Sequence, residues 1–136
     1  MAPNNACLAT ASWNGTDLVI TTNSSTVSGV TYPAVTRKLD PANGTILWQT
    51  GLADGPVLGN SALDGAGIVA AITYSKVSPT STNQLSLINA TTGAVLANYA
   101  TATLTGGGPV WADGYLMFGG DDGVLHAYTP SLPPAG

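Results

Sequence analysis

The strongest constraint in this sequence is an internal repeat with a period of about fifty residues. The phrase Leu-Asp-Pro-Ala-Asn-Gly-Thr-Ile-Leu-Trp-Gln-Thr at residues 39–50 returns at residues 88–99 as Ile-Asn-Ala-Thr-Thr-Gly-Ala-Val-Leu-Ala-Asn-Tyr. A second phrase, residues 14–20, matches residues 64–70 and then residues 113–118. Strand-like runs that recur at this period predict a propeller or solenoid array in place of an ordinary globular domain.

The composition favours an all-β fold. Hydrophobic residues make up 44% of the 136 residues and charged residues only 7%, with no Glu. The 17 Gly and 9 Pro, together with many Ser and Thr, supply turn residues, whereas good helix formers other than Ala and Leu are scarce. Short apolar runs bounded by Gly and Asn are typical of strands between tight turns.

The charge balance argues against two classes of partner. The formal net charge is −4, and Arg37, Lys38 and Lys76 are the only Arg and Lys residues. Nucleic-acid phosphates and anionic membrane surfaces are held mainly by clusters of Lys and Arg, so we expect neither partner. The longest apolar run, residues 66–72, is far shorter than the roughly 20 residues of a membrane span, so we expect no membrane span.

The single cysteine and the glycosylation motifs bear on location. Cys7 has no partner for an internal disulfide; we expect a small buried side chain in the first strand, and an intermolecular bridge or a reactive thiol stays open. Asn-X-Ser/Thr motifs occur at Asn14, Asn23, Asn43 and Asn89. With the poverty in Lys and Glu, they favour an extracellular or periplasmic location.

The repeat divides the chain into strands. Units one and two each predict four strands, and unit three predicts three. The tail that follows, residues 130–136, contains three Pro and cannot donate a regular ladder. We therefore expect residues 1–136 to form a single propeller segment, with units at about 7–52, 56–101 and 108–130. The expected strands are Cys7–Trp13, Asp17–Thr22, Ala34–Leu39, Thr45–Thr50, Val57–Leu63, Ile68–Tyr74, Gln84–Ile88, Ala94–Tyr99, Pro109–Ala112, Tyr115–Phe118 and Val124–Tyr128.

The connection between the second and third strands varies from unit to unit. We expect a polar loop at residues 23–33 in unit one, a loop at 75–83 in unit two and a tight hairpin at 120–123 in unit three. Length changes confined to one connection are typical of repeat arrays. In the outer strand of unit one, alternation predicts Ile46 and Trp48 on one face, with Leu47 and Gln49 on the other.

Residues 39–48 resemble the repeat of the pyrroloquinoline-quinone (PQQ) enzyme β-propellers. In that repeat an Asp, a Gly four residues later and a Trp eight residues later form a turn-and-docking motif between blades. Asp40, Gly44 and Trp48 have this spacing. The Asp caps the turn, the Gly takes a positive φ, and the Trp ring can pack flat on the next blade.

Units two and three depart from this motif in part. Unit two has Asn89 in place of Asp and Ala97 in place of Trp, and it keeps Gly93. Unit three ends before the motif, although residues 119–128 resemble the family's hairpin into the third strand. The similarity covers about residues 7–130. It implies antiparallel β-propeller blades, about three here with the last one incomplete, in a partial propeller or a ring completed by association.

The resemblance implies two kinds of activity. The family includes PQQ-dependent alcohol and sugar dehydrogenases, and also cofactor-free scaffold propellers such as the outer-membrane-protein assembly lipoprotein. The dehydrogenases resemble one another in a Ca²⁺ site with a Glu ligand, a catalytic Asp and often two adjacent cysteines. This sequence has no Glu and one Cys, so no catalytic or cofactor-binding position is carried over. PQQ and Ca²⁺ are implied only if the chain is a segment of such a dehydrogenase.

Several residues that could carry chemistry also have a structural interpretation. His126 is the only histidine, and we expect it to be a packed or solvent-facing strand residue in preference to a catalytic base. Asp121 and Asp122 could ligate Ca²⁺. Two carboxylates beside Gly at a hairpin tip are, however, more typical of a turn than of a metal site. The three glycines at 106–108 precede a strand, so we expect them to let the crossover bend toward a central channel and not to hold phosphate.

The aromatic residues leave a further alternative open. Trp13, Trp48 and Trp111, with five Tyr, could form a carbohydrate-stacking surface. All three lie in or beside expected strands, so inter-blade core is the stronger expectation.

Closure sets the expected partner and function. Propellers typically close with four to eight blades, so three blades leave apolar faces open. We expect completion by the remainder of a longer propeller or by a homo-oligomer, in which two copies would supply six blades. The function favoured is a non-catalytic scaffold or binding module. A segment of a PQQ-dependent dehydrogenase and a carbohydrate-binding surface remain the alternatives.

Overall fold

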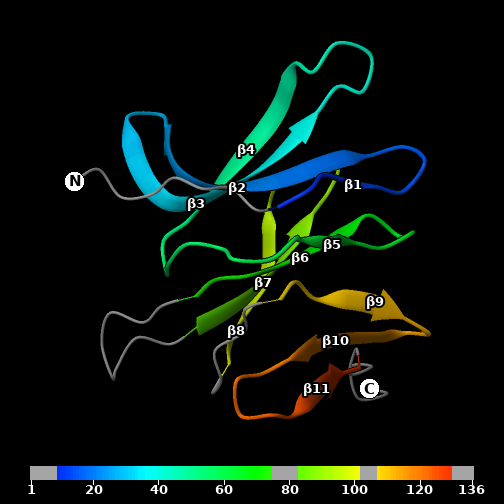
Figure 1. Ribbon diagram of the computed structural model, residues 1–136. Coiled ribbons are helices and arrows are strands. Elements are labelled where there is room, and N and C mark those ends of the chain that lie inside the picture. The colour runs from blue at the N-terminus through cyan, green and yellow to red at the C-terminus, as the bar shows by residue number, and fades with distance from the viewer. Residues whose placement is uncertain (1–8, 75–82, 102–106, 130–136) are drawn as a thin grey trace, which may run out of the picture.

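The computed structural model of this protein describes residues 9–74, 83–101 and 107–129, which fold into three antiparallel sheets without a helix (Figure 1). The expected all-β fold, with four, four and three strands, is confirmed for these residues. The first sheet holds β1 (Ser12–Trp13), β2 (Leu18–Val27), β3 (Val30–Leu39) and β4 (Ile46–Leu52). The second holds β5 (Ala62–Leu63), β6 (Ile68–Ile72), β7 (Asn83–Asn89) and β8 (Val95–Thr101), and the third β9 (Val110–Ala112), β10 (Tyr115–Gly119) and β11 (Leu125–Tyr128).

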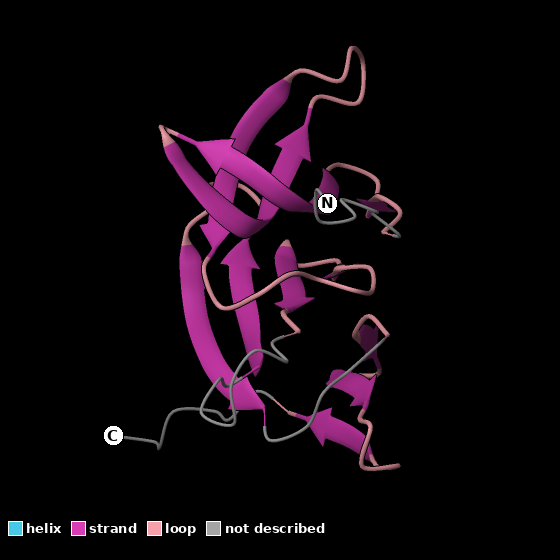
Figure 2. Cartoon of the chain, turned by 60° about the vertical axis from the view of Figure 1, so that its left-hand side comes forward, coloured by secondary structure: helices cyan, strands magenta, loops and turns pink. Residues whose placement is uncertain are grey.

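The sheets stack face to face in chain order (Figure 2). In the first and second sheets, we call the face that points toward the next sheet the front and the opposite face the back. In the third sheet, the back points toward the second sheet and the front is the opposite face. Alternate residues of β6 enter two different cores, so both faces of the middle sheet are buried. The core between sheets one and two contains Val19, Ala34, Leu52, Val57, Val69, Ala71, Ile88 and Ala90, and the core between sheets two and three contains Ala70, Ile72, Leu85, Leu116 and Phe118.

The strand registers identify the equivalent positions of the three units. Leu18 pairs with Leu39 in the first sheet, Val69 with Ile88 in the second, and Leu116 with Tyr128 in the third. The ungapped sequence match, which aligned residues 14–20 with 64–70, is therefore wrong by one position. The turn closed by Asp64 N and Ile68 O has one residue more than the turn closed by Asn14 N and Asp17 O. A slip of one residue exchanges the two faces of a strand, so only the register reveals the true repeat.

β2 and β3 form a longer hairpin than expected. The polar loop predicted at residues 23–33 is wrong, because both strands continue to a two-residue turn at Ser28 and Gly29. Both turn residues have positive φ, 50° and 82°, as a turn that follows the twist of a hairpin requires. The hydroxyls of Thr26 and Thr31 bond across the strands at 3.0 Å. The segment looks polar because of its Asn, Ser and Thr residues, but its β-branched Thr and Val residues suit a ladder.

The far end of this hairpin covers part of the back of the first sheet. A Cβ on Gly51 would lie 2.4 Å from the ring of Tyr32, so the ring rests directly on that glycine. Val35, the cross-strand partner of Gly51, is fully buried. Ser24, at a φ of 39°, stands opposite Pro33, where the otherwise continuous register lacks a pair because proline has no N–H to donate.

Two further expectations need correction at the inner strands. The strand predicted at Val57–Leu63 is wrong over residues 57–61, and β5 is only Ala62–Leu63. The backbone N–H and C=O of Val57 are bonded to the side chain of Asn23, at 2.7 and 2.9 Å, in place of a neighbouring strand. The first strand begins at Ser12, and Cys7 lies outside the described residues. The other strands differ from expectation by one or two residues at their ends.

A β-bulge changes the facing of the outer strands. Ile46 pairs with Leu39 and Trp48 pairs with Lys38, so Leu47 is an extra residue. Ile46 therefore shares the back with Leu39, while Trp48 lies on the front, and the predicted common face of Ile46 and Trp48 is wrong. The second unit has the same irregularity between Leu87 and Ile88 on β7, opposite β8.

Close backbone packing between the second and third units gives a first prediction. A Cβ on Gly59 would lie 2.1 Å from the backbone N of Gly108, so Gly59→Ala should force the two segments apart. We expect a loss of about 1–3 kcal/mol in the free energy of unfolding, measured by urea denaturation. Gly65→Ala is the matched control, because a Cβ there meets nothing within 4 Å. Equal stability of the two variants would contradict this packing.

Candidate functional site

The first and second sheets dock through an indole and a glycine. Trp48 on β4 lies against the turn between β7 and β8, where its Nε1 donates to the carbonyl oxygen of Ala90 at 2.9 Å. The hydroxyl of Thr50 donates to the carbonyl oxygen of Gly93 at 2.6 Å. A Cβ on Gly93 would lie 2.8 Å from the indole ring, so glycine leaves the room that the ring takes. The structure thus brings together Trp48 of unit one and Gly93 of unit two.

The two turns that carry the repeat motif have the same geometry. The N–H of Gly44 donates to the carbonyl oxygen of Asp40 at 2.7 Å, and that of Gly93 to the carbonyl oxygen of Asn89 at 2.8 Å. Both glycines have a φ of 76°. The side-chain Oδ1 of Asp40 and of Asn89 each accepts from the backbone N–H two residues later, at 2.8 Å. Asn keeps the turn in unit two because the capping contact needs an oxygen and not a charge.

Two asparagines from the glycosylation motifs bridge the same sheets. Asn14 Nδ2 donates to the carbonyl oxygen of Asp64 at 3.1 Å. Asn23 holds both backbone groups of Val57, and it lies in the segment that the sequence placed in a loop. Asn43 is exposed in its turn. Sequence reasoning missed the bridging role of Asn23, and the Thr- and Val-rich residues after it were the available signal that a strand continues there.

An ion pair lies beside this junction. Lys38 Nζ is 2.5 Å from Asp17 Oδ1, and both side chains are mostly buried. The hydrogen bond from Lys38 lowers the pKa of Asp17 below its ordinary value; the Asn14 amide and the Lys38 charge act in the same direction, and desolvation opposes them. Asn14 joins the pair to the second sheet through Asp64. The carboxylate therefore supports the docking of two sheets.

The two ends of the stack expose rows that are equivalent to buried ones. On the back of the first sheet, Trp13, Leu18, Leu39 and Ile46 form one cross-strand row. The corresponding rows are Leu63, Val69, Ile88 and Val95 in the second sheet and Trp111, Leu116 and Tyr128 in the third. The inner members differ between the sheets: Trp13 is 53% exposed, whereas its equivalent Leu63 is half-buried and Val69 and Ile88 are fully buried. The outer members, Ile46 and Val95, are exposed in both sheets, at 49% and 44%. The back of the first sheet is thus an interface face without its neighbour among the described residues.

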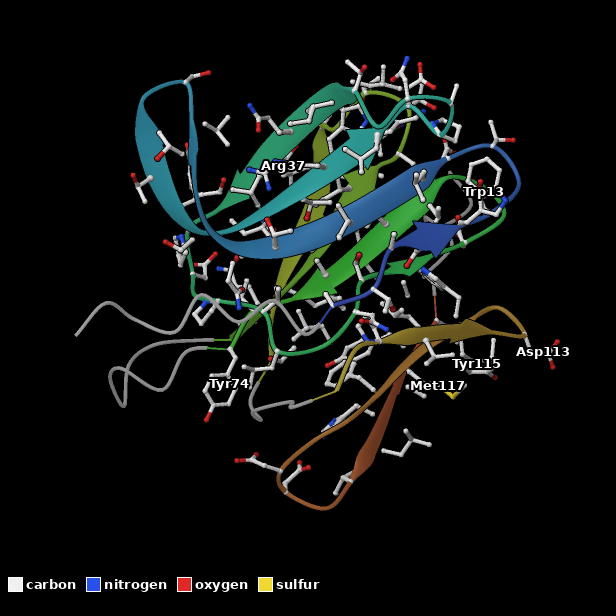
Figure 3. All side chains as sticks on the ribbon, turned by 45° about the horizontal axis from the view of Figure 1, so that its top comes forward. Trp13, Arg37, Tyr74, Asp113, Tyr115 and Met117 are labelled. Atoms are coloured by element: carbon white, nitrogen blue, oxygen red, sulfur yellow. The ribbon has the colours of Figure 1, made fainter. Side chains whose placement is uncertain are left out.

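The front of the third sheet is the other open face. Val110, Met117 and Ala127 form a row there, equivalent to the buried row that contains Ala70 in the second sheet. Val110 is 56% exposed and Leu125, further along β11, 67% exposed. Figure 3 labels Trp13 and Arg37 on the first sheet and Tyr115 and Met117 on the third. These two end faces are the candidate interaction surfaces of the chain.

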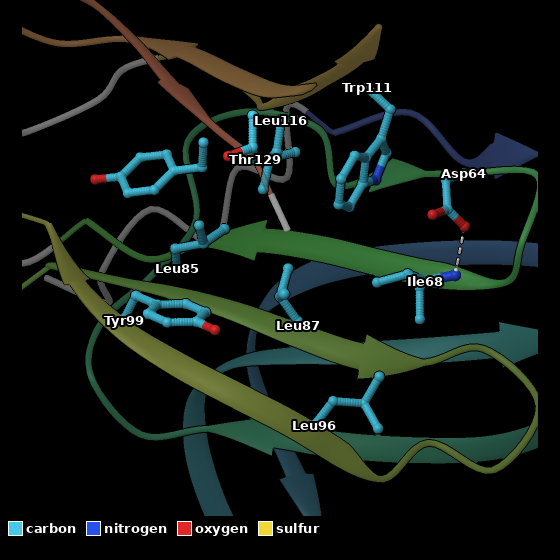
Figure 4. Close-up of a pocket in the computed structure, with 10 residues that line it drawn as sticks. Asp64, Ile68, Leu85, Leu87, Leu96, Tyr99, Trp111, Leu116 and Thr129 are labelled. Carbon is cyan, nitrogen blue, oxygen red and sulfur yellow. Dashed lines mark hydrogen bonds between the residues drawn. The ribbon is translucent and has the colours of Figure 1, made fainter. Parts of the chain in front are cut away.

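An apolar cavity of about 330 Å³ lies between the second and third sheets (Figure 4). Most of its lining comes from β7, β8, β10 and β11, with Trp111 on β9 at one side. The indole Nε1 of Trp111 is buried and has no hydrogen-bond partner among the described residues. The cavity is lined by Asp64, Ile68, Leu85, Leu87, Leu96, Tyr99, Trp111, Leu116, Tyr128 and Thr129.

The acidic hairpin of unit three makes a turn and holds the histidine. Asp122 Oδ1 accepts from the N–H of Val124 at 3.0 Å, and its Oδ2 is 2.9 Å from His126 Nε2. The imidazole stacks on Phe118 with the ring centres 5.3 Å apart. Asp121 lies beside Asp122 in this turn. Across the described ranges, no group of three or more His, Cys, Asp or Glu side chains could hold a metal ion.

The remaining sequence candidates have structural neighbours. Arg37 donates to Gln49 at 3.3 Å and to the hydroxyls of Thr22 and Ser25, on the back of the first sheet. With Lys38 bound to Asp17, both described cations are engaged within the chain. Two of the three tryptophans, at 48 and 111, pack at sheet interfaces.

Within residues 9–74, 83–101 and 107–129, no helix is long and apolar enough to cross a bilayer.

Comparisons with known proteins show the fold and no closer relationship. The sequence matches no protein-family profile. It also matches no curated protein. The fold resembles the crystal structure of BamB from Moraxella catarrhalis, at 14% identity and a TM-score of 0.66, over 89% of this chain and 32% of BamB. A europium-containing methanol dehydrogenase is 14% identical, with a TM-score of 0.48, over 82% of this chain and 20% of that one.

This chain therefore spans about a third of the BamB chain that it resembles. The likeness supports the PQQ-like propeller fold that the repeat motif implied, and the three stacked sheets are a partial β-propeller.

The docking of Trp48 can be tested with a pair of glycines. Gly93→Ala and Gly44→Ala both place a side chain at a φ of 76°, which costs about 1–2 kcal/mol in either turn. Only the first places a Cβ 2.8 Å from the Trp48 ring. We expect Gly93→Ala to lower the free energy of unfolding by about 1–3 kcal/mol more than Gly44→Ala, measured by urea denaturation. A smaller loss at position 93 would contradict the docking contact.

The Asp17–Lys38 pair predicts an acid-dependent contribution to stability. The folded-state pKa of Asp17 lies below its unfolded value of about 3.9, so the contribution is complete above that value and is lost as pH falls through the folded pKa. In Lys38→Met we expect the Asp17 pKa to rise toward its ordinary value in a carboxyl NMR titration, and the acid-side slope of stability to become shallower. Arg37→Met removes the same charge without touching Asp17, so its titration should keep the wild-type pKa.

Proposed function

We propose that this chain is a non-catalytic scaffold portion of a PQQ-like β-propeller, which works by packing its two end faces against further blades. The carrying observation is the equivalence between Trp13, 53% exposed on the back of the first sheet, and Leu63 and Trp111, which pack against the cores between the sheets. The inner members of such a row are covered in the second and in the third sheet. The equivalent apolar surface on the back of the first sheet is exposed, so we expect a further sheet to pack against it.

The roles of the polar side chains support a scaffold. Asn14, Asn23 and Asp17 join or brace the first two sheets, and Asp122 caps a hairpin. Arg37 and Lys38 would be the described cations available to a carboxylate-rich quinone, and both already have partners. The dehydrogenase alternative therefore needs catalytic and cofactor-binding groups from other parts of a longer protein.

The carbohydrate-binding alternative has less support from the geometry. Such surfaces need exposed aromatic rings in a shared plane. Trp48 and Trp111 lie in sheet interfaces. The exposed aromatic residues are divided among the three sheets, with Trp13 in the first, Tyr99 in the second, and Tyr115 and Tyr128 in the third. We further propose an extracellular or periplasmic site of action, on the composition and the asparagine motifs of the sequence.

The scaffold proposal predicts association that depends on the end faces. We expect the full chain to self-associate in sedimentation velocity, with the back of one copy covered by the front of another. Trp13→Asp should weaken this association at least about tenfold, because it buries a carboxylate in the interface. Val30→Asp is the matched control: Val30 is also 53% exposed but lies at the hairpin turn outside the row, and its variant should associate like wild type.

A monomeric wild-type chain would contradict the proposal, and so would equal association of the two variants. A second measurement addresses catalysis. Added PQQ and Ca²⁺ should give no change in quinone absorbance and no dye reduction with alcohols or sugars, whereas turnover would favour the dehydrogenase alternative.

A further inference from the structure

The two interfaces between the sheets of this chain are filled by different side chains. At the first interface, the front of the first sheet carries Lys38 on β3 and its cross-strand partner Trp48 on β4. At the second interface, the equivalent pair on the front of the second sheet is Leu87 and Ala97. A lysine and an indole are therefore replaced by a leucine and an alanine.

The charged groups of the first interface are replaced as well. Lys38 forms an ion pair with Asp17 there. Ile68 takes the place of Asp17 at the second interface, since these two residues immediately precede Val69 and Leu18, which are equivalent by register. Two charged side chains thus give way to two aliphatic ones, so the equivalent volume at the second interface is less polar.

The apolar cavity between the second and third sheets lies in this volume. Leu87 and Ile68 line it, and Leu96 and Tyr99 line it on either side of Ala97 in β8. The side chain of alanine ends at its Cβ, so it leaves open the space that an indole at this position would take.

The opposite wall also corresponds to the docking place of the indole. At the first interface, Trp48 Nε1 donates to the carbonyl oxygen of Ala90, the residue after Asn89. Thr129 is the equivalent of Asn89 when the register is continued, and it lines the cavity beside Tyr128. The cavity therefore extends to the place that the Trp48 ring occupies at the first interface.

Larger side chains at two neighbouring positions do not fill the cavity. Thr36 and Thr50 pair in the first sheet, and their equivalents Leu85 and Tyr99 pair in the second. Leu85 and Tyr99 form walls of the cavity, which keeps a volume of about 330 Å³. An apolar cavity of about 150 Å³ stays dry and takes one benzene ring, so this cavity has room for two fused rings.

One polar group of the cavity wall lacks a partner. Trp111 lines the cavity from β9, and Figure 4 shows its ring reaching toward the second sheet. Its Nε1 is buried and has no hydrogen-bond partner among the described residues. A buried N–H without an acceptor is unfavourable, so a ligand that brings an acceptor to this donor gains a hydrogen bond.

The charges at the cavity favour a neutral ligand. Asp64 is one of the lining residues, and its Oδ1 accepts from the backbone N–H groups of Ala66 and Ile68. No Lys or Arg is among the described lining residues, and Arg37 and Lys38 are engaged within the first sheet. An anion would meet a carboxylate and no cation, so a carboxylate-rich quinone such as PQQ does not fit this cavity.

We propose that the cavity between the second and third sheets binds a neutral, planar aromatic ligand of two fused rings that carries one hydrogen-bond acceptor. The rings take the place that the Trp48 indole has at the first interface, and the acceptor bonds to Trp111 Nε1–H. The site lies between two sheets of one chain, so it goes beyond the scaffold function and does not depend on association.

The test uses two ring systems of the same shape and the full-length chain. Isoquinoline, at a pH where it is neutral, carries one ring nitrogen as an acceptor, and naphthalene carries none. We expect saturable binding of both in an NMR titration that follows the amide and indole N–H signals, with the Trp111 signal shifted. In Trp111→Phe, isoquinoline should lose about tenfold more affinity than naphthalene, because only isoquinoline loses a hydrogen bond.

A second variant fills the cavity. Ala97→Trp supplies at the second interface the indole that Trp48 supplies at the first, so both probes should bind at least about tenfold more weakly. Ala42→Trp is the matched control. It adds the same side chain at an exposed turn of the first unit and should leave binding within about twofold of wild type.

Three results would overturn the site. They are no saturable binding to the folded wild-type chain, equal losses of the two probes in Trp111→Phe, and unchanged binding in Ala97→Trp, which would place the probes on the exposed end faces. Circular dichroism verifies that each variant is folded, and if one of them is not, the other decides alone.

Trp13→Asp separates this site from the scaffold proposal. Trp13 lies on the back of the first sheet and is not a wall of the cavity, so its variant should bind isoquinoline within about twofold of wild type. A wild-type chain that is monomeric but binds the probes would overturn the scaffold proposal alone. A chain that associates as expected but binds neither probe would overturn the cavity site alone.

Discussion

The structure depends on face-to-face packing of sheets that cannot cover themselves. Each unit presents a row of large apolar side chains on its back, and the inner members of the row are buried where the front of another sheet lies against them. Val69 and Ile88 are fully buried in this way between the first two sheets. Burying one such aliphatic side chain contributes about 1.5–3 kcal/mol, so Val69 and Ile88 together outweigh a single hydrogen bond at the rim, which contributes about 0.5–1.5 kcal/mol. Those bonds, from Trp48 and Asn23 among others, fix how the sheets are aligned.

The sequence could predict the docking turns because their chemistry is local. An Asp or Asn followed four residues later by Gly specifies the turn, and Asn89 and Gly93 form the same turn as Asp40 and Gly44. The facing of each strand was harder to predict, because it depends on single-residue insertions. The turn between β5 and β6 has one extra residue, which exchanges the two faces of β6 relative to the sequence match. The bulge in β4 opposite Lys38 and Leu39 exchanges the faces of the residues on either side of it. The candidate site consists of cross-strand rows, so it became visible only with the registers.

The two ends of the stack are not alike. On the back of the first sheet, Tyr32 rests on Gly51 and Val35 is buried beneath the hairpin, so part of the face is already covered by the chain itself. The front of the third sheet has small or flexible residues, Ala127 and Met117, and no such cover among the described residues. A neighbour at the first end must therefore fit around the hairpin, whereas at the other end the exposed side chains of Val110 and Leu125 meet the neighbour directly.

One polar position in the third strand recurs in all three units and has a structural role in each. Arg37, Ser86 and His126 are equivalent by register, and each lies on the back of its sheet. In the first two units a Gln or Asn on the outer strand bonds to this side chain. In the third unit His126 is paired with Asp122 of its own hairpin and stacked on Phe118. A histidine beside an aspartate suggests a catalytic pair when read alone, but its repeat equivalents are an arginine and a serine in the same structural place. Three different side chains thus fill one position of the repeat, and each is bonded within its own sheet.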